Sequence, residues 1–291
     1  MKYITQLLFL MTVTSCNFFD KEINLEIPEH TPRIVVNAIV EAGGEELRLA
    51  ITRSLGMRDT SSFSEPLPNP EILAIVNGQS FIDFQLDTAN HYVIPATIQT
   101  GDRIELEVRA PNMETVFSET VVPVAPHIRN VKLGGTVYDF GGWEKREISF
   151  VIQDIPSQEN FYSVKFIQER EDFPNYFGSL GIGIDSPITW LNYVYSGLAF
   201  TDAVFRDGEA TITIWVDEYH ISRISDQTSN FLLVETLEKA NYDYRTTFYT
   251  HYNNQQPGLF GGEPAPMVNN VRGGFGLFSS SAGVKIPLER E

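Results

Sequence analysis

Cysteine is almost absent from this chain of 291 residues, in which Cys16 is the only one. No intramolecular disulfide can form, whatever the redox state of the compartment. Histidine is scarce too: the five histidines contain neither a His-Glu-x-x-His motif nor any pair spaced four apart. The sequence also lacks a Gly-x-Ser-x-Gly motif, and the glycine-dense segment 178–183 does not match a phosphate-binding loop. We therefore expect no zinc site, no hydrolase nucleophile elbow and no cofactor.

Basic residues are few, since 21 lysines and arginines stand against 38 aspartates and glutamates, and the formal net charge is −17. No segment is rich in lysine or arginine. A chain this acidic is repelled by nucleic acid and by anionic membrane surfaces. We therefore expect no nucleic-acid partner.

The N-terminal apolar stretch, residues 4–13, is too short to cross a bilayer, which takes about 20 residues. It follows Lys2 and runs into Val13-Thr14-Ser15-Cys16, which fits the bacterial lipobox. The pattern predicts a lipoprotein signal peptide over residues 1–15, lipidation of Cys16 with palmitate-type acyl chains, and a tether over residues 16–31. An ordinary buried thiol behind an apolar N-terminal strand is the alternative for Cys16.

The residues after the lipobox bear on localisation. Asn17 stands where an aspartate would signal retention in the inner membrane. We therefore expect a lipid anchor in the outer membrane of a Gram-negative cell envelope. The charged group Asp20, Lys21 and Glu22 resembles the short acidic signals that send some lipoproteins to the cell surface, although a solvated tether explains it equally well.

Period-two patterning is the dominant signal in the rest of the chain. About seven short segments of residues 32–124 alternate apolar with polar side chains, and Asn77-Gly78 is a strong hairpin-turn signal. The pattern predicts a mainly β fold that begins with an immunoglobulin-like β-sandwich. Pro123 and Pro126 interrupt the pattern, so we place a domain boundary there.

Residues 125–291 are predicted to form a second β-rich domain with one principal helix. Strand candidates cover residues 128–137, 147–153, 162–168 and 210–216. The helix is predicted near residues 227–252, because apolar side chains recur there at helical spacings. These side chains are Phe231, Val234, Leu237, Tyr244, Phe248 and Tyr252. The β-branched run over residues 246–250 favours a strand, so an earlier helix end is the alternative.

Few residues suggest chemistry. Acidic clusters occur at residues 169–172 and at Asp217-Glu218, but paired carboxylates hydrolyse glycosides only at a defined separation that a sequence does not supply. Asp217 and His220 are three residues apart, which fits a surface pair better than a metal site. The aromatic residues Trp190, Tyr193, Tyr195 and Phe200 form either a platform for a glycan or peptide ligand, or part of the core.

A glycine motif near the C-terminus resembles the domain of unknown function 4249 family. It begins at Asn269 or Asn270 and ends in Arg272-Gly273-Gly274-Phe275-Gly276-Leu277-Phe278. Weaker similarities are the opening strand at residues 33–37, Arg53-Ser54, the proline boundary at residues 122–126 and the segment 260–264. The resemblance implies a Bacteroidetes-type outer-membrane lipoprotein, often encoded near TonB-dependent receptors. It implies no catalytic residue. We interpret the glycines as structural, because glycine permits positive φ and close strand packing.

These observations favour a non-enzymatic function. The first hypothesis is an accessory or binding partner of a TonB-dependent receptor in nutrient uptake. The alternative is a surface adhesion or structural module that binds a protein or glycan. An envelope hydrolase is the third and least favoured hypothesis.

Overall fold

The computed structural model describes residues 29–56, 58–59, 65–139, 141–156, 158–170, 173–177, 180–181, 189–191, 197–222, 228–254 and 265–288. The predicted signal peptide, Cys16 and nearly all of the predicted tether lie outside these residues. Within them, no helix has both the length and the apolar character needed to span a membrane. The predicted mainly β class is confirmed, and the immunoglobulin-like form of the first part stays a prediction.

Eight strands form the first part of the chain as two facing layers. One layer is β1–β2–β6–β5, and the other is β4–β3–β7–β8. Their inward side chains, from Ile34 to Val122, make a continuous apolar core. Asn77 and Gly78 have φ of 48° and 88° between β3 and β4, which confirms the predicted turn. The strands are β1 (Ile34–Glu41), β2 (Glu46–Arg53), β3 (Glu71–Val76), β4 (Gln79–Phe81), β5 (Gln85–Leu86), β6 (Tyr92–Pro95), β7 (Arg103–Arg109) and β8 (Val116–Val121).

The second part is also built from two facing layers. The strands β14–β15–β11–β17–β18 form one layer, and β13–β16–β10–β9 the other. Between them lies a second core, which includes Phe150, Phe166 and Ile214. The strands are β9 (His127–Tyr138), β10 (Glu144–Gln153), β11 (Phe161–Arg170), β12 (Phe173–Phe177), β13 (Leu180–Gly181), β14 (Thr189–Leu191), β15 (Gly197–Thr201), β16 (Glu209–Asp217), β17 (Thr228–Leu237) and β18 (Phe275–Pro287).

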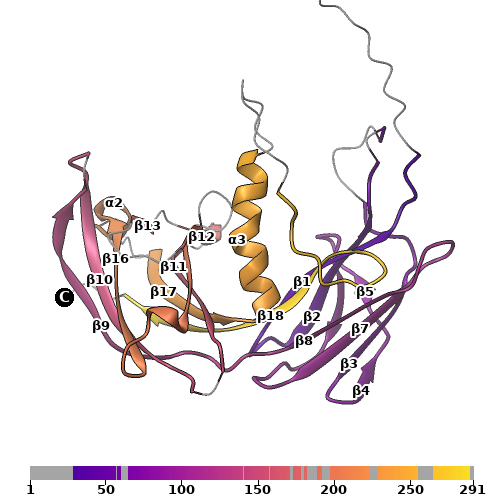
Figure 1. Cartoon of the computed structure of the whole chain (residues 1–291), viewed down its shortest axis with the longest axis horizontal. Helices are drawn as coiled ribbons and strands as arrows, with labels where there is room; N and C mark the ends of the chain where they lie inside the picture. Colours follow the sequence, from indigo (N-terminus) through magenta and orange to yellow (C-terminus); the bar gives the residue numbers. More distant parts are fainter. Residues whose placement is uncertain are drawn as a thin grey trace, which may run out of the picture.

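Strand β18 belongs to both parts (Figure 1). Its first half pairs in parallel with β1, from Phe275 opposite Val35 to Ser281 opposite Glu41. Its second half pairs antiparallel with β17, from Ser281 opposite Leu237 to Pro287 opposite Phe231. The C-terminal segment also adds Val271 and Phe278 to the first core. A ten-stranded sheet therefore runs through both parts of the molecule.

The glycine motif allows the close approach of β18 to its neighbours. Gly276 has φ of +119°, and a Cβ there would collide with the carbonyl oxygen of Val36 on β1. A Cβ on Gly274 would collide with the carbonyl oxygen of Ile34 and lie 2.6 Å from Cγ1 of Val116. The side chain of Asn270 closes the loop, because its amide donates to the Phe278 carbonyl and its oxygen accepts from the Phe278 N–H. The geometry agrees with the structural interpretation of this motif.

The principal helix starts later than predicted. Residues 228–237 form β17, and helix α3 covers Lys239–Asn254, so the prediction of a helix from residue 227 is wrong. The spacing of Phe231, Val234 and Leu237 imitates a helix, but the four consecutive apolar residues 231–234 show no alternation, because β17 is covered on both faces. The alternative of an early helix end is also wrong. Thr246 and Thr247 lie inside α3, where their hydroxyls donate to the carbonyls of Tyr242 and Asp243.

A buried ionic cluster holds α3 against the sheet. Arg245 of α3 and Lys165 of β11 both contact Oε2 of Glu235 on β17, at 3.0 and 2.7 Å. Arg245 also donates to Asn241 and to the hydroxyl of Ser163. Burial would raise the pKa of the Glu235 carboxyl, but the two cations lower it to about 2. Glu238 caps the helix by accepting from the N–H of Ala240 and the hydroxyl of Ser279.

We predict that Gly274→Val lowers the free energy of unfolding by about 2 kcal/mol or more, because the added side chain meets the β1 backbone. Urea unfolding measures this loss. Gly135→Val is the matched control, since a Cβ at Gly135 of β9 meets nothing within 4 Å. The structural interpretation is wrong if Gly274→Val unfolds like the wild type and instead loses binding of a ligand.

We predict that Glu235→Gln destabilises the protein by about 3 kcal/mol near neutral pH, because two buried cations lose their shared carboxylate. The pKa of Glu235 is lower in the folded chain than its ordinary value of 4.5, so its contribution is present above about pH 4.5. That contribution disappears as the pH falls toward 2, and the two proteins converge in stability. Glu105→Gln, in an exposed pair with Arg103, is the control and changes stability little. A pH-independent difference between wild type and Glu235→Gln would contradict this account.

Candidate functional site

Three large aromatic side chains lie open to solvent at one end of the second part. Trp143 is 72% exposed, Tyr138 is 65% exposed and Tyr219 is 56% exposed. Together they line a hollow of about 880 Å³. Its charged lining residues are Glu144, Lys145, Asp217 and Glu218. We call these seven residues the hairpin site, because most of them lie on the β9–β10 hairpin.

The turn of the hairpin holds Trp143 in place. The carboxylate of Asp139 accepts from the N–H groups of Gly141 and Trp143, each at 2.9 Å. The Asp139 N–H donates to the Trp143 carbonyl, and Gly142 takes the positive φ of +77° that the turn needs. The indole lies against Gly141, where a Cβ would be 2.8 Å from its Cδ1. The turn therefore fixes the backbone of Trp143, while its side chain is exposed.

Asp139 stays ionised over a wide pH range. The N–H of Trp143 is the main cause that lowers the pKa of this carboxyl, and partial desolvation opposes it. The Gly141 N–H and the Lys145 ammonium lower the pKa further. Asp139 is thus an anchor for the turn, and it is a poor proton donor near neutral pH.

Ion pairs position the short helix α2 (Glu218–Ser222), which carries Tyr219. Arg146 of β10 binds Glu218 with two parallel contacts of 2.7 Å, and this bidentate geometry restricts both side chains. Hydrogen bonding to Glu218 raises the pKa of the Arg146 guanidinium. Lys145 contacts Asp217, which ends β16, and lies 3.5 Å from Asp139. The hairpin, β16 and α2 are therefore cross-linked around the hollow.

The hairpin site contains one of the predicted acidic clusters. Asp217 and Glu218 lie within it, where each pairs with a cation. Glu169, from the other cluster, pairs with Lys285 of β18 instead, and residues 171–172 lie outside the described part of the chain. The side chain of His220 is likewise not described. Within the described residues, no group of three or more His, Cys, Asp or Glu side chains is arranged to hold a metal ion.

The aromatic residues at 190–200, which the sequence left open as a platform or as core, are tested at Phe200 alone among the described side chains. Phe200 is fully buried in the second core, so its interpretation as core is correct. Tyr193 and Tyr195 lie outside the described residues, and Trp190 lies in β14. Sequence reasoning missed Tyr138 and Trp143. The segment Tyr138–Trp143 could have indicated this site, because Asp139 and two glycines are typical turn residues and here they stand between aromatic residues.

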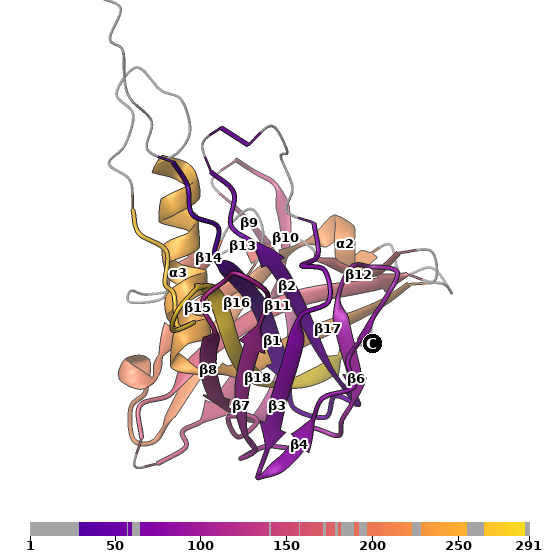
Figure 2. The same cartoon turned by 90° about the vertical axis from the view of Figure 1, so that its right-hand side faces the viewer.

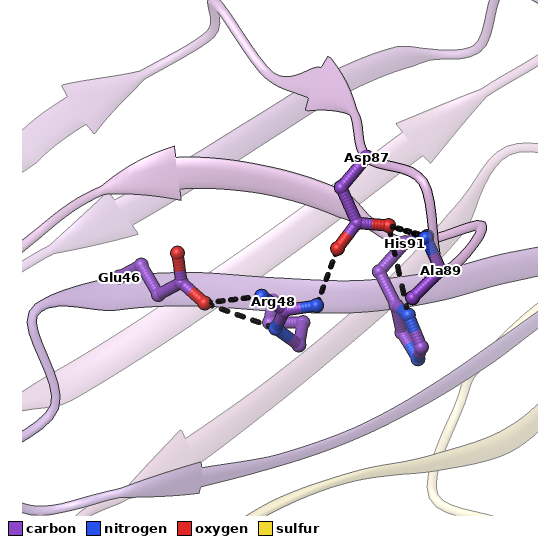
Figure 3. Close-up of polar contacts among 5 residues, drawn as sticks. All are labelled: Glu46, Arg48, Asp87, Ala89 and His91. Carbon is purple, nitrogen blue, oxygen red and sulfur yellow. Dashed lines mark hydrogen bonds and ion pairs between the residues drawn. The ribbon is translucent and has the colours of Figure 1, made fainter.

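A second polar cluster lies in the first part (Figure 3). The Asp87 carboxylate accepts from the N–H groups of Ala89 and His91, at 2.9 and 2.8 Å, and pairs with Arg48. Arg48 also contacts Glu46 at 2.7 Å. The His91 N–H is the main cause that lowers the pKa of Asp87. The cluster ties the β5–β6 turn to β2, so we interpret it as structural.

A hollow of about 830 Å³ lies beside this turn, lined by three prolines and several apolar side chains. Among them, Ile82 is 64% exposed and Leu86 51% exposed. Charged groups are sparse, since Glu65 is the single acidic or basic residue in the lining. The hairpin site combines aromatic surface with several fixed charges, and it is therefore the better candidate.

The fold and the hairpin site define a mainly β protein that presents a preformed, aromatic-rich surface to solvent. Residues 20–286 match the model of the domain of unknown function DUF4249, and the chain belongs to that family. No curated protein matches the sequence. Among solved structures, a DUF4785 family protein from Legionella pneumophila is similar over 69% of this chain, with 11% identity and a TM-score of 0.23. The match spans about half of that protein, 51% of its length.

We predict that Asp139→Ala loosens the hairpin turn without unfolding the protein, because the N–H groups of Gly141 and Trp143 lose their acceptor. Hydrogen exchange at these two amides then becomes faster. Asp102→Ala is the matched control, because Asp102 accepts from the Gln99 N–H in a similar turn of the first part. Unchanged exchange at the Trp143 amide in Asp139→Ala would show that other contacts hold the turn.

Proposed function

We propose that this protein is a lipid-anchored, non-catalytic binding protein of the outer membrane, and that it serves a TonB-dependent receptor as an accessory in nutrient uptake. The exposed aromatic cluster of the hairpin site is the observation that carries this proposal. Contiguous exposed apolar surface rimmed by polar groups is typical of interaction sites. Aromatic side chains and arginine are also enriched where binding energy is concentrated.

The geometry of the carboxylates supports binding over catalysis. Glu218 is held in a bidentate pair with Arg146, and Asp217 and Asp139 share Lys145. A catalytic acid needs a raised pKa, whereas the causes at Asp139 lower its pKa. The charged groups of the hairpin site thus fix its shape and supply hydrogen-bond acceptors.

The position of the N-terminal segment supports placing the hairpin site near the membrane. Lipidation of Cys16 would anchor the protein through residues 17–28, immediately before the described part of the chain. In Figures 1 and 2 the first described residues, the end of α3 and the β9–β10 turn all reach toward the same end of the molecule. The protein would then be anchored in the same membrane as a receptor. Confinement to one surface raises the effective concentration of the two partners, so that even a weak contact between them forms.

A surface adhesion module is the second candidate, and strand β9 is the observation that favours it. This strand of 12 residues lies at the edge of its sheet in the described part of the chain. An edge strand can bind an extended peptide by strand addition. An adhesin would be recovered with a protein or glycan of another surface and without a receptor. The hydrolase hypothesis would require turnover of a glycan or peptide by the purified protein.

We predict that Cys16→Ser releases the protein from the outer membrane or leaves an unprocessed precursor, because a serine cannot take the lipid. Membrane fractionation and the mass of the mature N-terminus measure this. Wild-type protein that carries acyl chains on Cys16 is the expected control. Firm outer-membrane attachment of Cys16→Ser would contradict the anchor.

The receptor partnership is tested by affinity purification of the wild-type chain from mildly solubilised outer membranes. We expect a TonB-dependent receptor to co-purify, and Cys16→Ser to recover much less of it. Repeated purification without any receptor would contradict the partnership.

A further inference from the structure

We infer that the hairpin site binds a neutral saccharide. This inference rests on the proposed function, because it names the ligand class that the accessory protein would hold. Three observations support it: the exposed aromatic side chains, the acidic lining and the open shape of the site.

The aromatic side chains provide flat apolar faces that remain in contact with water. Trp143, Tyr138 and Tyr219 are each more than half exposed, so covering their rings removes apolar surface from water. A pyranose ring has an apolar face of C–H groups that matches the face of an indole or phenol. The Asp139 turn and the Arg146–Glu218 pair order in advance the backbone that carries Trp143 and Tyr219, which lowers the entropic cost of binding.

The polar groups at the rim suit hydroxyl groups. The lining contains three carboxylates, from Glu144, Asp217 and Glu218, and one ammonium from Lys145. A carboxylate has about four acceptor positions, so one already paired with a cation can still accept from a sugar hydroxyl. The Tyr138 hydroxyl donates to Glu144 at 3.3 Å and can join the same network.

The charge of the site disfavours anionic ligands. Even when Arg146, which pairs with Glu218, is counted beside Lys145, three carboxylates face two cations and leave the site acidic. The whole chain has a formal net charge of −17. An acidic polysaccharide, a phosphate or a nucleic acid would meet like charge at the rim. A neutral ligand avoids this cost.

The openness of the site disfavours a small organic cation. Aromatic cages bind quaternary ammonium groups strongly when the cation is desolvated between the rings. Rings that are 56–72% exposed form an open surface with little desolvation. Two of the three acidic groups in the lining, Asp217 and Glu218, already pair with Lys145 and Arg146.

The inference is tested by titrating the full chain, in micelles of a detergent without a sugar headgroup, with defined probes. The neutral probes are maltohexaose, cellohexaose, mannohexaose and xylohexaose. Hexagalacturonate tests an acidic saccharide, and tetramethylammonium tests a cation. We expect at least one neutral probe to bind with a Kd of about 1 mM or tighter, as measured by calorimetry.

Substitutions at Trp143 and Leu86 test whether the saccharide binds at the hairpin site. Trp143→Ala should weaken it by about tenfold or more, whereas Trp143→Phe should retain most of it, since phenylalanine keeps a flat ring. Leu86→Ala is the matched control, because Leu86 is 51% exposed in the apolar hollow of the first part. All three variants should melt like the wild type, since the altered side chains are exposed.

The outcomes separate this inference from the proposed function. The saccharide inference is overturned if no neutral probe binds, or if Trp143→Ala binds as well as the wild type. It is also overturned if hexagalacturonate or tetramethylammonium binds in place of a neutral probe. Receptor co-purification would then still support the accessory role. Conversely, saccharide binding at Trp143 without any co-purifying receptor would leave this inference standing and contradict the proposed partnership.

Discussion

The pairing of β18 with both β1 and β17 is the constraint on which the rest of the structure depends. A single strand of 13 residues joins the two parts in one sheet, and only Ser281 faces a partner on both sides. Gly274 and Gly276 make this possible, because a side chain at either position would collide with the backbone of β1. The middle of the strand carries three buried serines, Ser279–Ser281, over which α3 packs. The family motif is therefore explained by the backbone contacts that it permits.

Much of the fold could be predicted from local patterns, and the failures have physical causes. Period-two alternation located most strands of the first part, because one face of each strand is buried and the other is solvated. The Asn77-Gly78 turn was predictable since both residues tolerate positive φ. The start of α3 was not, because β17 is covered on both faces and its apolar run shows no alternation. The parallel pairing of β1 with β18 joins residues about 240 apart, and no local pattern encodes it.

The hairpin site could be predicted only in part for a related reason. Asp217 and Glu218 were visible as an acidic pair, but the partners that orient them, Lys145 and Arg146, are 72 residues away in sequence. The exposure of a side chain is also decided by the tertiary structure. The sequence alone therefore does not distinguish the exposed Trp143 from a buried aromatic residue such as Phe200. The ion pairs and the Asp139 turn do not bury the aromatic rings. They order the backbone that carries the rings, and this combination of exposed rings on an ordered backbone is what makes the site suited to binding.

The central claim is that Trp143 is a preformed contact for a neutral saccharide. Indole N–H resonances report on it directly, because the chain has three tryptophans and Trp143 is exposed in the β9–β10 hairpin. On addition of the neutral oligosaccharide that binds best, the account predicts a saturable shift of the Trp143 resonance and little change in the other two. A fixed Trp143 resonance, with shifts at the other tryptophans or at none, would contradict it.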